Sequence, residues 1–251
     1  MTKHMFQGIE KLYGQDKLDR LASSHATIIG IGGVGSWAAE LLVRSGLGKV
    51  TLIDLDDICI SNSNRQIHTL QSTIGKSKVL VLSERLLEIN PKVNIEIIED
   101  FVTTKNLDSV VKETDFVIDA IDGVKTKAYL IDHCIKKNIP LVTTGAAGGK
   151  TNPAQIRIDD LGNTQNDMLL KRVRRVLRRE LGYEKGLSQF QVTSVYSYEK
   201  VVLPKGCHLD NGGKLDCSNS LGSAGFVTGA IGMTAASVVI NKLAGKEIGP
   251  N

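Results

Sequence analysis

Residues 28–36 read Ile28-Ile29-Gly30-Ile31-Gly32-Gly33-Val34-Gly35-Ser36, an apolar run that passes into closely spaced glycines. The apolar residues are typical of a buried strand, and the residues after Ser36 have the periodicity of a helix. Glycines at such a joint permit a tight turn and bring the backbone close to phosphate, whose charge the helix N-terminus stabilises. The stretch therefore predicts the strand, turn and helix that open a nucleotide-binding α/β fold.

The rest of the chain repeats this alternation of apolar runs and helical patterns. We expect strands at 26–31, 50–54, 94–98, 116–121 and 141–144, and helices at 36–45, 76–89, 106–112 and 125–138. After Gly145 come a strand at 155–158, a basic helix and a loop rich in Gly, Asn and Asp. We predict a Rossmann-like, mainly parallel sheet with helices on both faces. It forms one domain, with a nucleotide-binding core over 1–150 and a smaller C-terminal region over 151–251.

The composition is that of a soluble globular protein and argues against a cysteine-rich zinc protein and a secreted protein. Hydrophobic residues make up 41% and charged residues 23% of the 251 residues, as in soluble globular proteins. The cysteines are scattered, at Cys59, Cys134, Cys207 and Cys217. Without a C-x-x-C pair, an all-cysteine zinc site is not expected, and free thiols suggest a reducing compartment. The first 16 residues contain no apolar signal core, so we expect a cytoplasmic protein.

The last apolar segment, residues 226–240, raises the question of a membrane span. Its 15 residues fall short of the roughly 20 that a bilayer requires. Gly229, Gly232 and several alanines favour a buried helix that packs through small side chains. We expect no stable membrane span.

Asp54 ends the second predicted strand with a carboxylate, nineteen residues after Gly35. An acidic residue at this point is well placed to bind ribose hydroxyls. Gly30, Gly32 and Gly35 also satisfy the dinucleotide fingerprint. The glycine motif alone therefore leaves an NAD-dependent oxidoreductase open.

The residues after Asp54 favour nucleotide activation over hydride transfer. Arg65 ends a Ser-Asn-Ser-Asn-Arg run, and Lys78 follows thirteen residues later. Two such cations suit a triphosphate, because charge builds up as pyrophosphate departs. Asp122 follows another strand, where a carboxylate can hold Mg²⁺ together with substrate phosphates. Singly, Arg65 could pair with a surface acid, Lys78 could be a solvated charge and Asp122 could cap a helix.

Together these motifs resemble the adenylation domain of ubiquitin-activating-like enzymes, a family that includes activators of sulfur-carrier proteins in molybdopterin and thiamine biosynthesis. The pattern is G-x-G-G-x-G-S, then D-x-D, S-N-x-x-R-Q, a downstream Lys and a strand-end Asp. The resemblance implies an ATP site made of Gly30, Gly32, Gly33, Gly35, Asp54, Asp56, Asn62, Arg65, Gln66 and Lys78. It also implies that Arg65, Lys78 and Asp122 are catalytic and that Asp122 binds Mg²⁺.

Within this family the sequence is most similar, over nearly its whole length, to members that modify tRNA. The similarity is carried by residues 12–14, 33–40, 64–68, 145–150 and 171–179. It implies ATP-dependent dehydration of a threonylcarbamoyl-adenosine beside the anticodon, through an acyl adenylate, with release of AMP and pyrophosphate. It further implies a homodimer and an association with a cysteine desulfurase or sulfur-acceptor system.

The basic helix supports an RNA partner. Six cations fall within nine residues: Lys171, Arg172, Arg174, Arg175, Arg178 and Arg179. At helical spacing Val173, Val176 and Leu177 face inward and the cations outward. A solvated helix face is the simpler interpretation, but such a ridge suits a phosphate backbone. We therefore predict that these six residues bind tRNA.

The chief alternative keeps the adenylation and changes the acceptor. A sulfur-carrier or ubiquitin-like protein would present its C-terminal carboxylate, and Cys207 or Cys217 could then take the acyl group. Both thiols are more simply explained as loop or core residues. The absence of C-x-x-C pairs and the presence of the basic helix favour tRNA over a carrier protein.

Three further features leave questions open. Family members usually carry an arginine near the N-terminus, whereas the first one here is Arg20. Lys3 or Lys11 would supply a point charge without a bidentate grip. Lys150 is a candidate substrate contact or a surface charge. His68 and His133 are expected to be structural.

Overall fold

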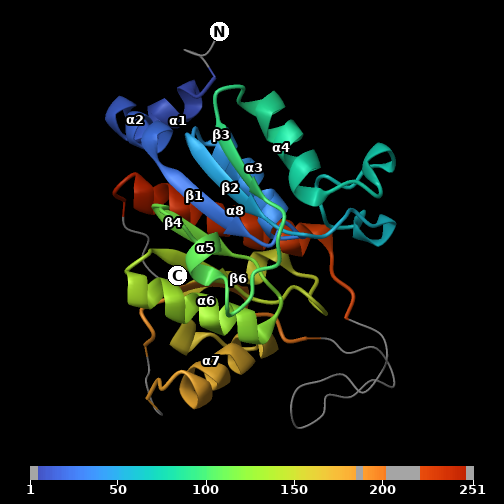
Figure 1. Cartoon of the computed structure of the whole chain (residues 1–251), viewed down its shortest axis with the longest axis vertical. Helices are drawn as coiled ribbons and strands as arrows, with labels where there is room; N and C mark the ends of the chain where they lie inside the picture. The colour runs from blue at the N-terminus through green and yellow to red at the C-terminus, as the bar shows by residue number, and fades with distance from the viewer. Residues whose placement is uncertain (1–4, 185–188, 202–220, 247–251) are drawn as a thin grey trace.

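The computed structural model describes residues 5–184, 189–201 and 221–246. Within this part of the chain the strands form a seven-stranded sheet in the order β3-β2-β1-β4-β5-β7-β6 (Figure 1). The strands are β1 (His25–Ile29), β2 (Lys49–Ile53), β3 (Asn94–Ile98), β4 (Phe116–Asp119), β5 (Leu141–Thr144), β6 (Ile156–Asp160) and β7 (Thr193–Ser197). All pairings are parallel except that of β6 with β7.

Helices cover both faces of this sheet (Figure 1). One core includes α3 (Gly35–Arg44), α4 (Lys78–Ile89) and α8 (Gly225–Leu243). The core on the other face includes α5 (Leu107–Val110), α6 (Val124–Lys137) and α7 (Met168–Glu180). Two helices precede β1, α1 (Gln7–Tyr13) and α2 (Gln15–Ser23), and short 3₁₀ helices span Ile60–Asn62, Gln71–Thr73, Pro153–Gln155 and Leu161–Asn163. The predicted fold class is confirmed.

Element boundaries show where local patterns mislead. The predicted bounds of β3 and β5 are correct, whereas β1, β2 and β4 end earlier than predicted because the chain turns away at the pocket edge. At Gly30 this turn takes a positive φ of 88°. The helix predicted at 106–112 is the single turn α5, and the strand predicted at 155–158 is β6, shifted toward Asp160. The helices α1 and α2 and the strand β7 were not predicted.

Helix α8 is long and apolar enough to cross a membrane by length and composition. In the structure it lies in the core, where Val227, Ile231 and Val239 are fully buried. Its glycines permit this packing, because a Cβ on Gly232 would lie 2.4 Å from the Val34 carbonyl oxygen. The expectation of a buried helix that packs through small residues is confirmed.

Candidate active site

A pocket of about 640 Å³ lies where the parallel strands end. Crevices at the carboxyl ends of such strands are the usual ligand sites of α/β sheets. The predicted residues that line it are Gly30, Gly32, Gly33, Asp54, Asp56, Asn62, Arg65, Gln66, Lys78 and Asp122. The lining residues that the sequence did not suggest include Phe101, Ala146, Gly148, Leu169 and Leu221.

The glycine turn forms one wall of this pocket. A Cβ on Gly30 would lie 2.8 Å from the Ala120 carbonyl oxygen, so the turn packs directly against the end of β4. Gly35 is absent from the pocket lining, and a Cβ there would lie 1.9 Å from the Gly30 carbonyl oxygen. Gly35 therefore permits the backbone of the turn to close on itself.

Asp54 holds the glycine turn in place. Its Oδ2 accepts a hydrogen bond of 2.6 Å from the Ile31 amide, and its Oδ1 accepts one of 2.9 Å from the Asp56 amide. Since Asp54 also lines the pocket, its carboxylate combines a structural role with the predicted position beside a nucleotide. The sequence had indicated only the second.

Lys78 is a buried cation at the edge of the pocket. Its Nζ lies 2.6 Å from Oδ2 of Asp56, and its side chain is only 7% exposed, against 56% for Asp56. The alternative of a solvated helix charge is therefore wrong. Asp56 holds the ammonium group at the start of α4, where it faces the pocket.

Arg65 lines the same pocket from the segment between β2 and α4. Its Nη1 donates hydrogen bonds of 3.0 Å to the Ser61 carbonyl and to Oδ1 of Asn64, and its own carbonyl accepts one from Trp37 Nε1. Within the described residues Arg65 forms no ion pair with an acid, so the alternative of a surface salt bridge is not supported. The guanidinium charge remains available to the pocket.

Two amides lie beside Arg65. Asn62 closes its own turn, because its Oδ1 accepts a hydrogen bond from the Cys59 amide. Gln66 is 6% exposed, and its Oε1 is buried without a hydrogen-bond partner among the described residues. A buried amide oxygen of this kind calls for a donor, such as a water or a ligand group in the pocket.

Asp122 follows β4 at the pocket edge. It is exposed and forms no hydrogen bond or ion pair with any described residue. It does not cap α6, whose N-cap is Gly123. A carboxylate at the pocket edge without a partner among the described residues fits Mg²⁺, which binds one or two carboxylates together with substrate phosphates. The described residues contain no cluster of three or more metal-ligating side chains.

A fully buried ion pair lies behind Asp122. Lys127 Nζ is 2.9 Å from Oδ2 of Asp119, and both side chains are 0% exposed. The same carboxylate accepts hydrogen bonds from Thr143 Oγ1 and from the Ile121 amide. This pair braces the ends of β4 and β5 where they face the pocket. Sequence reasoning missed it, because a strand-end Asp and a helical Lys are common and the contact depends on packing.

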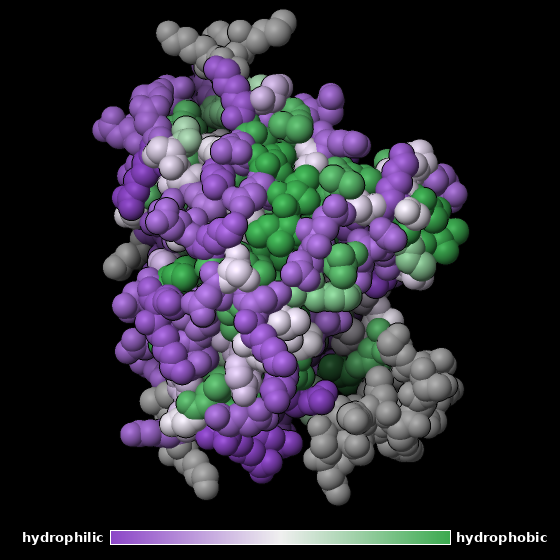
Figure 2. Space-filling view, viewed as in Figure 1, coloured by the Kyte–Doolittle hydropathy of each residue, from purple (hydrophilic) through white to green (hydrophobic). Residues whose placement is uncertain are grey.

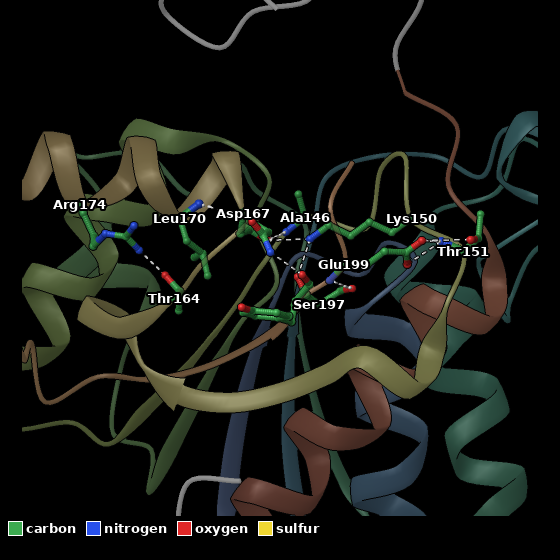
Figure 3. A network of polar contacts seen from close by, with 11 residues as sticks. Ala146, Lys150, Thr151, Thr164, Asp167, Leu170, Arg174, Ser197 and Glu199 are labelled. Carbon is green, nitrogen blue, oxygen red and sulfur yellow. Dashed lines mark hydrogen bonds and ion pairs between the residues drawn. The ribbon is translucent and has the colours of Figure 1, made fainter. Parts of the chain in front are cut away.

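A second buried pair holds the part of the pocket wall at Ala146 (Figure 3). Lys150 Nζ lies 3.4 Å from Oδ2 of Asp167 and donates a hydrogen bond of 2.9 Å to the Ser197 carbonyl. Oδ2 of Asp167 also accepts from the Ala146 amide, and its Oδ1 caps α7 through the Leu170 amide. Lys150 is 2% exposed. It is neither a surface charge nor an open substrate contact.

Helix α7 presents its cations in two directions. Lys171, Arg175 and Arg179 are exposed at i, i+4, i+8 spacing, on one stripe of the helix. Figure 2 shows many hydrophilic side chains over the end of the molecule where α7 lies in Figure 1. The inward side is formed by Val173 and Leu177, which are fully buried.

The other cations of α7 are partly buried. Arg174 donates hydrogen bonds to the Leu161 carbonyl and to Thr164 Oγ1, and burial lowers the pKa of its guanidinium. Arg178 lies 5.3 Å from the centre of the Phe190 ring. Arg172 and Val176 are half-buried. The expectation that all six cations point outward is therefore wrong.

His68 is buried within the segment between Arg65 and Lys78. It is 1% exposed, and neither ring nitrogen has a hydrogen-bond partner among the described residues. Burial, reinforced by the charges of Lys78 and Arg85, lowers its pKa to about 4. The ring is therefore neutral near pH 7, in keeping with the structural role expected for it.

The cysteines have little connection to the pocket. Cys134 is buried, and burial raises its pKa to about 12, while Cys59 is exposed. Neither lines the pocket. Cys207 and Cys217 lie outside the described residues, as does Lys3. Lys11 is exposed on α1.

Comparison with known proteins places this pocket in a family. The model of the ThiF family matches residues 7–251. The chain belongs to the ThiF family. Its relatives in that family include the tRNA threonylcarbamoyladenosine dehydratase of Haemophilus influenzae, 45% identical over 96% of this chain and 94% of the relative. The enzyme of the same name from Escherichia coli is 40% identical over 97% of this chain and 95% of its own length.

A solved structure extends the ThiF-family comparison to three dimensions. The crystal structure of the Escherichia coli tRNA N6-threonylcarbamoyladenosine dehydratase in complex with ATP is 40% identical to this chain. The two superpose with a TM-score of 0.87 over 96% of this chain and 94% of the other. The similarity covers both the nucleotide-facing strands and the C-terminal strands and helices.

Proposed function

We propose that this chain catalyses the ATP-dependent dehydration of N6-threonylcarbamoyladenosine in tRNA, with release of AMP and pyrophosphate. Two relatives that carry this activity in their names, those of Haemophilus influenzae and Escherichia coli, match the chain over almost their full length. One observation carries the proposal. A single pocket combines a glycine turn, the cations of Arg65 and Lys78 and the unpaired carboxylate of Asp122, and it extends to Leu169 at the start of the basic helix α7.

The chemistry explains the need for ATP. A carboxylate is a poor acyl electrophile because oxide would have to leave. In the proposed first step a carboxylate oxygen of the substrate attacks the α-phosphorus of ATP, and pyrophosphate departs. In the second step the carbamoyl group of the same side chain attacks the activated acyl carbon and loses a proton, and AMP departs. The net change in the nucleoside is the loss of one water. Because ring closure is intramolecular, orientation can supply much of its acceleration.

The residues of the pocket have distinct proposed roles. The glycine turn and Asp54 hold the nucleotide, while Asn62 and Gln66 lie around its α-phosphate. The guanidinium of Arg65 and the ammonium of Lys78 stabilise charge on the phosphorus as pyrophosphate leaves. Asp56 holds Lys78 in position through their 2.6 Å contact. Asp122 would hold Mg²⁺, which when bound would neutralise the phosphate oxygens.

The RNA would lie along α7. Lys171, Arg175 and Arg179 form the exposed stripe that can pair with phosphates, and half-buried Arg172 lies beside it. Arg174 and Arg178 would act indirectly, since their side chains contact the protein. Leu169 lines the pocket at the start of α7, so the pocket reaches the same end of the helix at which the stripe begins with Lys171.

A homodimer is part of the same proposal. Leu80 and Leu87 of α4 are 46% and 43% exposed, and Figure 2 shows hydrophobic side chains gathered over β3 and α4. A second copy that covered these side chains would remove an apolar surface from water. Light scattering should give twice the mass of 27.1 kDa. A concentration-independent monomer would contradict this part.

The test of the proposed function uses two readouts on one set of variants. Threonylcarbamoylated tRNA, ATP and Mg²⁺ are incubated with the protein, and nucleoside mass spectrometry measures the loss of water. ATP–pyrophosphate exchange reports the first step. Loss of a preorganised donor costs on the order of 10²–10³ in rate, so Arg65→Ala should slow both readouts by about that factor. Asp122→Ala removes the carboxylate proposed to hold Mg²⁺ and should also slow both readouts.

The control is Lys17→Ala, which removes an exposed charge from α2 at a residue that does not line the pocket. Full exchange in Arg65→Ala and Asp122→Ala would overturn the proposed site. An unchanged nucleoside, with exchange that appears only when a carrier protein is added, would support the sulfur-carrier alternative.

A further inference from the structure

Exposed Arg157 stacks on half-buried Tyr198 on the C-terminal part of the sheet. The guanidinium carbon of Arg157 lies 3.6 Å from the centre of the Tyr198 ring. Arg157 is exposed, and within the described residues it forms no ion pair and no side-chain hydrogen bond. One face of the guanidinium is therefore covered by the ring, while its donors and its other face remain open.

The stack lies on the face of the sheet that carries α7. Arg157 pairs with Tyr196 across β6 and β7. Tyr196 belongs to the core beneath α7, and half-buried Tyr198 packs against that core. The neighbours of Arg157 in β6, Ile156 and Ile158, pack into the opposite core. Side chains alternate along a strand, so Arg157 points to the α7 side.

The stack also lies at the pocket end of the sheet. β7 runs parallel to β5, whose carboxyl end lines the pocket, and Tyr198 directly follows β7. Asn166 donates a hydrogen bond of 2.7 Å to the Tyr198 carbonyl, and the next residue is Asp167, the N-cap of α7. Asp167 in turn holds the pocket wall at Ala146 (Figure 3). Arg157 and Tyr198 therefore lie beside the start of α7, close to the pocket wall.

We propose that Arg157 and Tyr198 form a stacking platform for an unpaired base of the RNA substrate, next to the nucleotide that enters the pocket. This inference rests on the proposed function, because it assumes that a single-stranded loop of tRNA binds along α7. Unpaired bases stack on aromatic rings and on arginine planes, and the tyrosine backing keeps the guanidinium flat against its ring. The exposed stripe of α7 would hold the phosphates, and this platform would hold a base.

The experiment measures binding of a labelled, threonylcarbamoylated anticodon stem-loop by fluorescence anisotropy, without ATP turnover. The unpaired loop nucleotides are made abasic one at a time, for the wild-type protein and for Arg157→Ala, Arg157→Lys and Tyr198→Ala. A stacked base contributes enough that its removal should weaken binding of the wild-type protein by about tenfold at one position. The same removal should have no further effect in Arg157→Ala and Tyr198→Ala.

The conservative variants separate stacking from charge and from folding. Arg157→Lys keeps the charge and therefore the salt dependence of binding, but it should lose the abasic effect because an ammonium has no plane. Tyr198→Phe keeps the ring and should keep the effect. ATP binding, measured by calorimetry, should be unchanged in all four variants.

The outcomes distinguish the two proposals. If the wild-type protein neither binds nor dehydrates the RNA, the proposed function fails. If it does both, but Arg157→Ala and Tyr198→Ala respond to each abasic position as the wild-type protein does, the platform alone is overturned. Lys17→Ala serves as the charge control and should behave as the wild-type protein does.

Discussion

Two buried Lys–Asp pairs lie behind the pocket at the ends of neighbouring strands, and they are built differently. On the nucleotide side the Nζ atom of Lys127 lies 2.9 Å from Oδ2 of Asp119. The groups that donate hydrogen bonds to this carboxylate, Thr143 Oγ1 and the Ile121 amide, belong to the unit β4-α6-β5. On the side of α7 the 3.4 Å pair of Lys150 and Asp167 joins the segment after β5 to the start of α7 and to the end of β7.

The difference shows two uses of a buried charge. Burying an ion pair costs desolvation, so neither pair is expected to stabilise the fold more than an apolar pair of the same shape. The pair near β4 keeps two adjacent parallel strands in register at the pocket edge. The pair near α7 instead makes the pocket wall and the basic helix one rigid unit. Variants of each pair can test this distinction.

The largest expected effect is on the nucleotide side. Lys127→Met leaves the Asp119 carboxylate, which is 0% exposed, without its cation. Breaking one side of such a pair typically costs about 3–5 kcal/mol, so the free energy of unfolding in urea should fall by that amount. The matched control is Lys125→Met, two residues earlier, where the lysine is 65% exposed and pairs with Glu180. A similar free energy of unfolding for the two variants would contradict the role assigned to Lys127.

A smaller loss is expected on the side of α7. Asp167→Asn keeps an oxygen that can cap α7, and Lys150 keeps its hydrogen bond to the Ser197 carbonyl. The uncompensated ammonium should lower the free energy of unfolding by about 2–3 kcal/mol, less than in Lys127→Met. Urea unfolding of Asp108→Asn, whose side chain is 79% exposed in its pair with Lys137, provides the baseline. If Asp167→Asn does not differ from that baseline, the pair does not join the wall to the helix.

The smallest expected effect is a dependence of stability on pH, and it comes from His68 on the nucleotide side. The folded-state pKa of His68 is about 4, below its ordinary value of 6.5, because burial disfavours the charged ring. The unfolded chain therefore binds the proton first, and stability is lost as pH falls from about 6.5 to about 4. At pH 5.5 the loss should be about 1 kcal/mol relative to pH 7.5.

Urea unfolding of wild type and His68→Gln at both pH values measures this difference. The variant should show a shallower fall in stability with acid, because its buried amide does not titrate. His133→Gln is the matched control, since its ring is only half-buried. Parallel pH profiles for wild type and His68→Gln would show that the buried ring does not contribute.

Prediction from the sequence was more accurate on the nucleotide side of the pocket than on the side of α7. On the nucleotide side the strand, the glycine turn and the acidic strand end are adjacent in the chain, and every predicted residue except Gly35 lines the pocket. On the side of α7 the strand β7 was missed. The prediction that Arg174 points outward was wrong, because its partners, Leu161 and Thr164, lie on a different segment.

The sequence by itself determined the fold class, most of the residues that line the pocket and the presence of a basic helix. Each depends on patterns within a few turns or strands, where periodicity and glycine stereochemistry act locally. Only the tertiary structure decided which charges are buried and which are free. Lys150 and Lys171 are both lysines, and nothing in the sequence marks either as buried. Lys150 is buried against Asp167, whereas Lys171 is exposed on α7. Desolvation depends on what other segments pack around a side chain, and no local pattern records that.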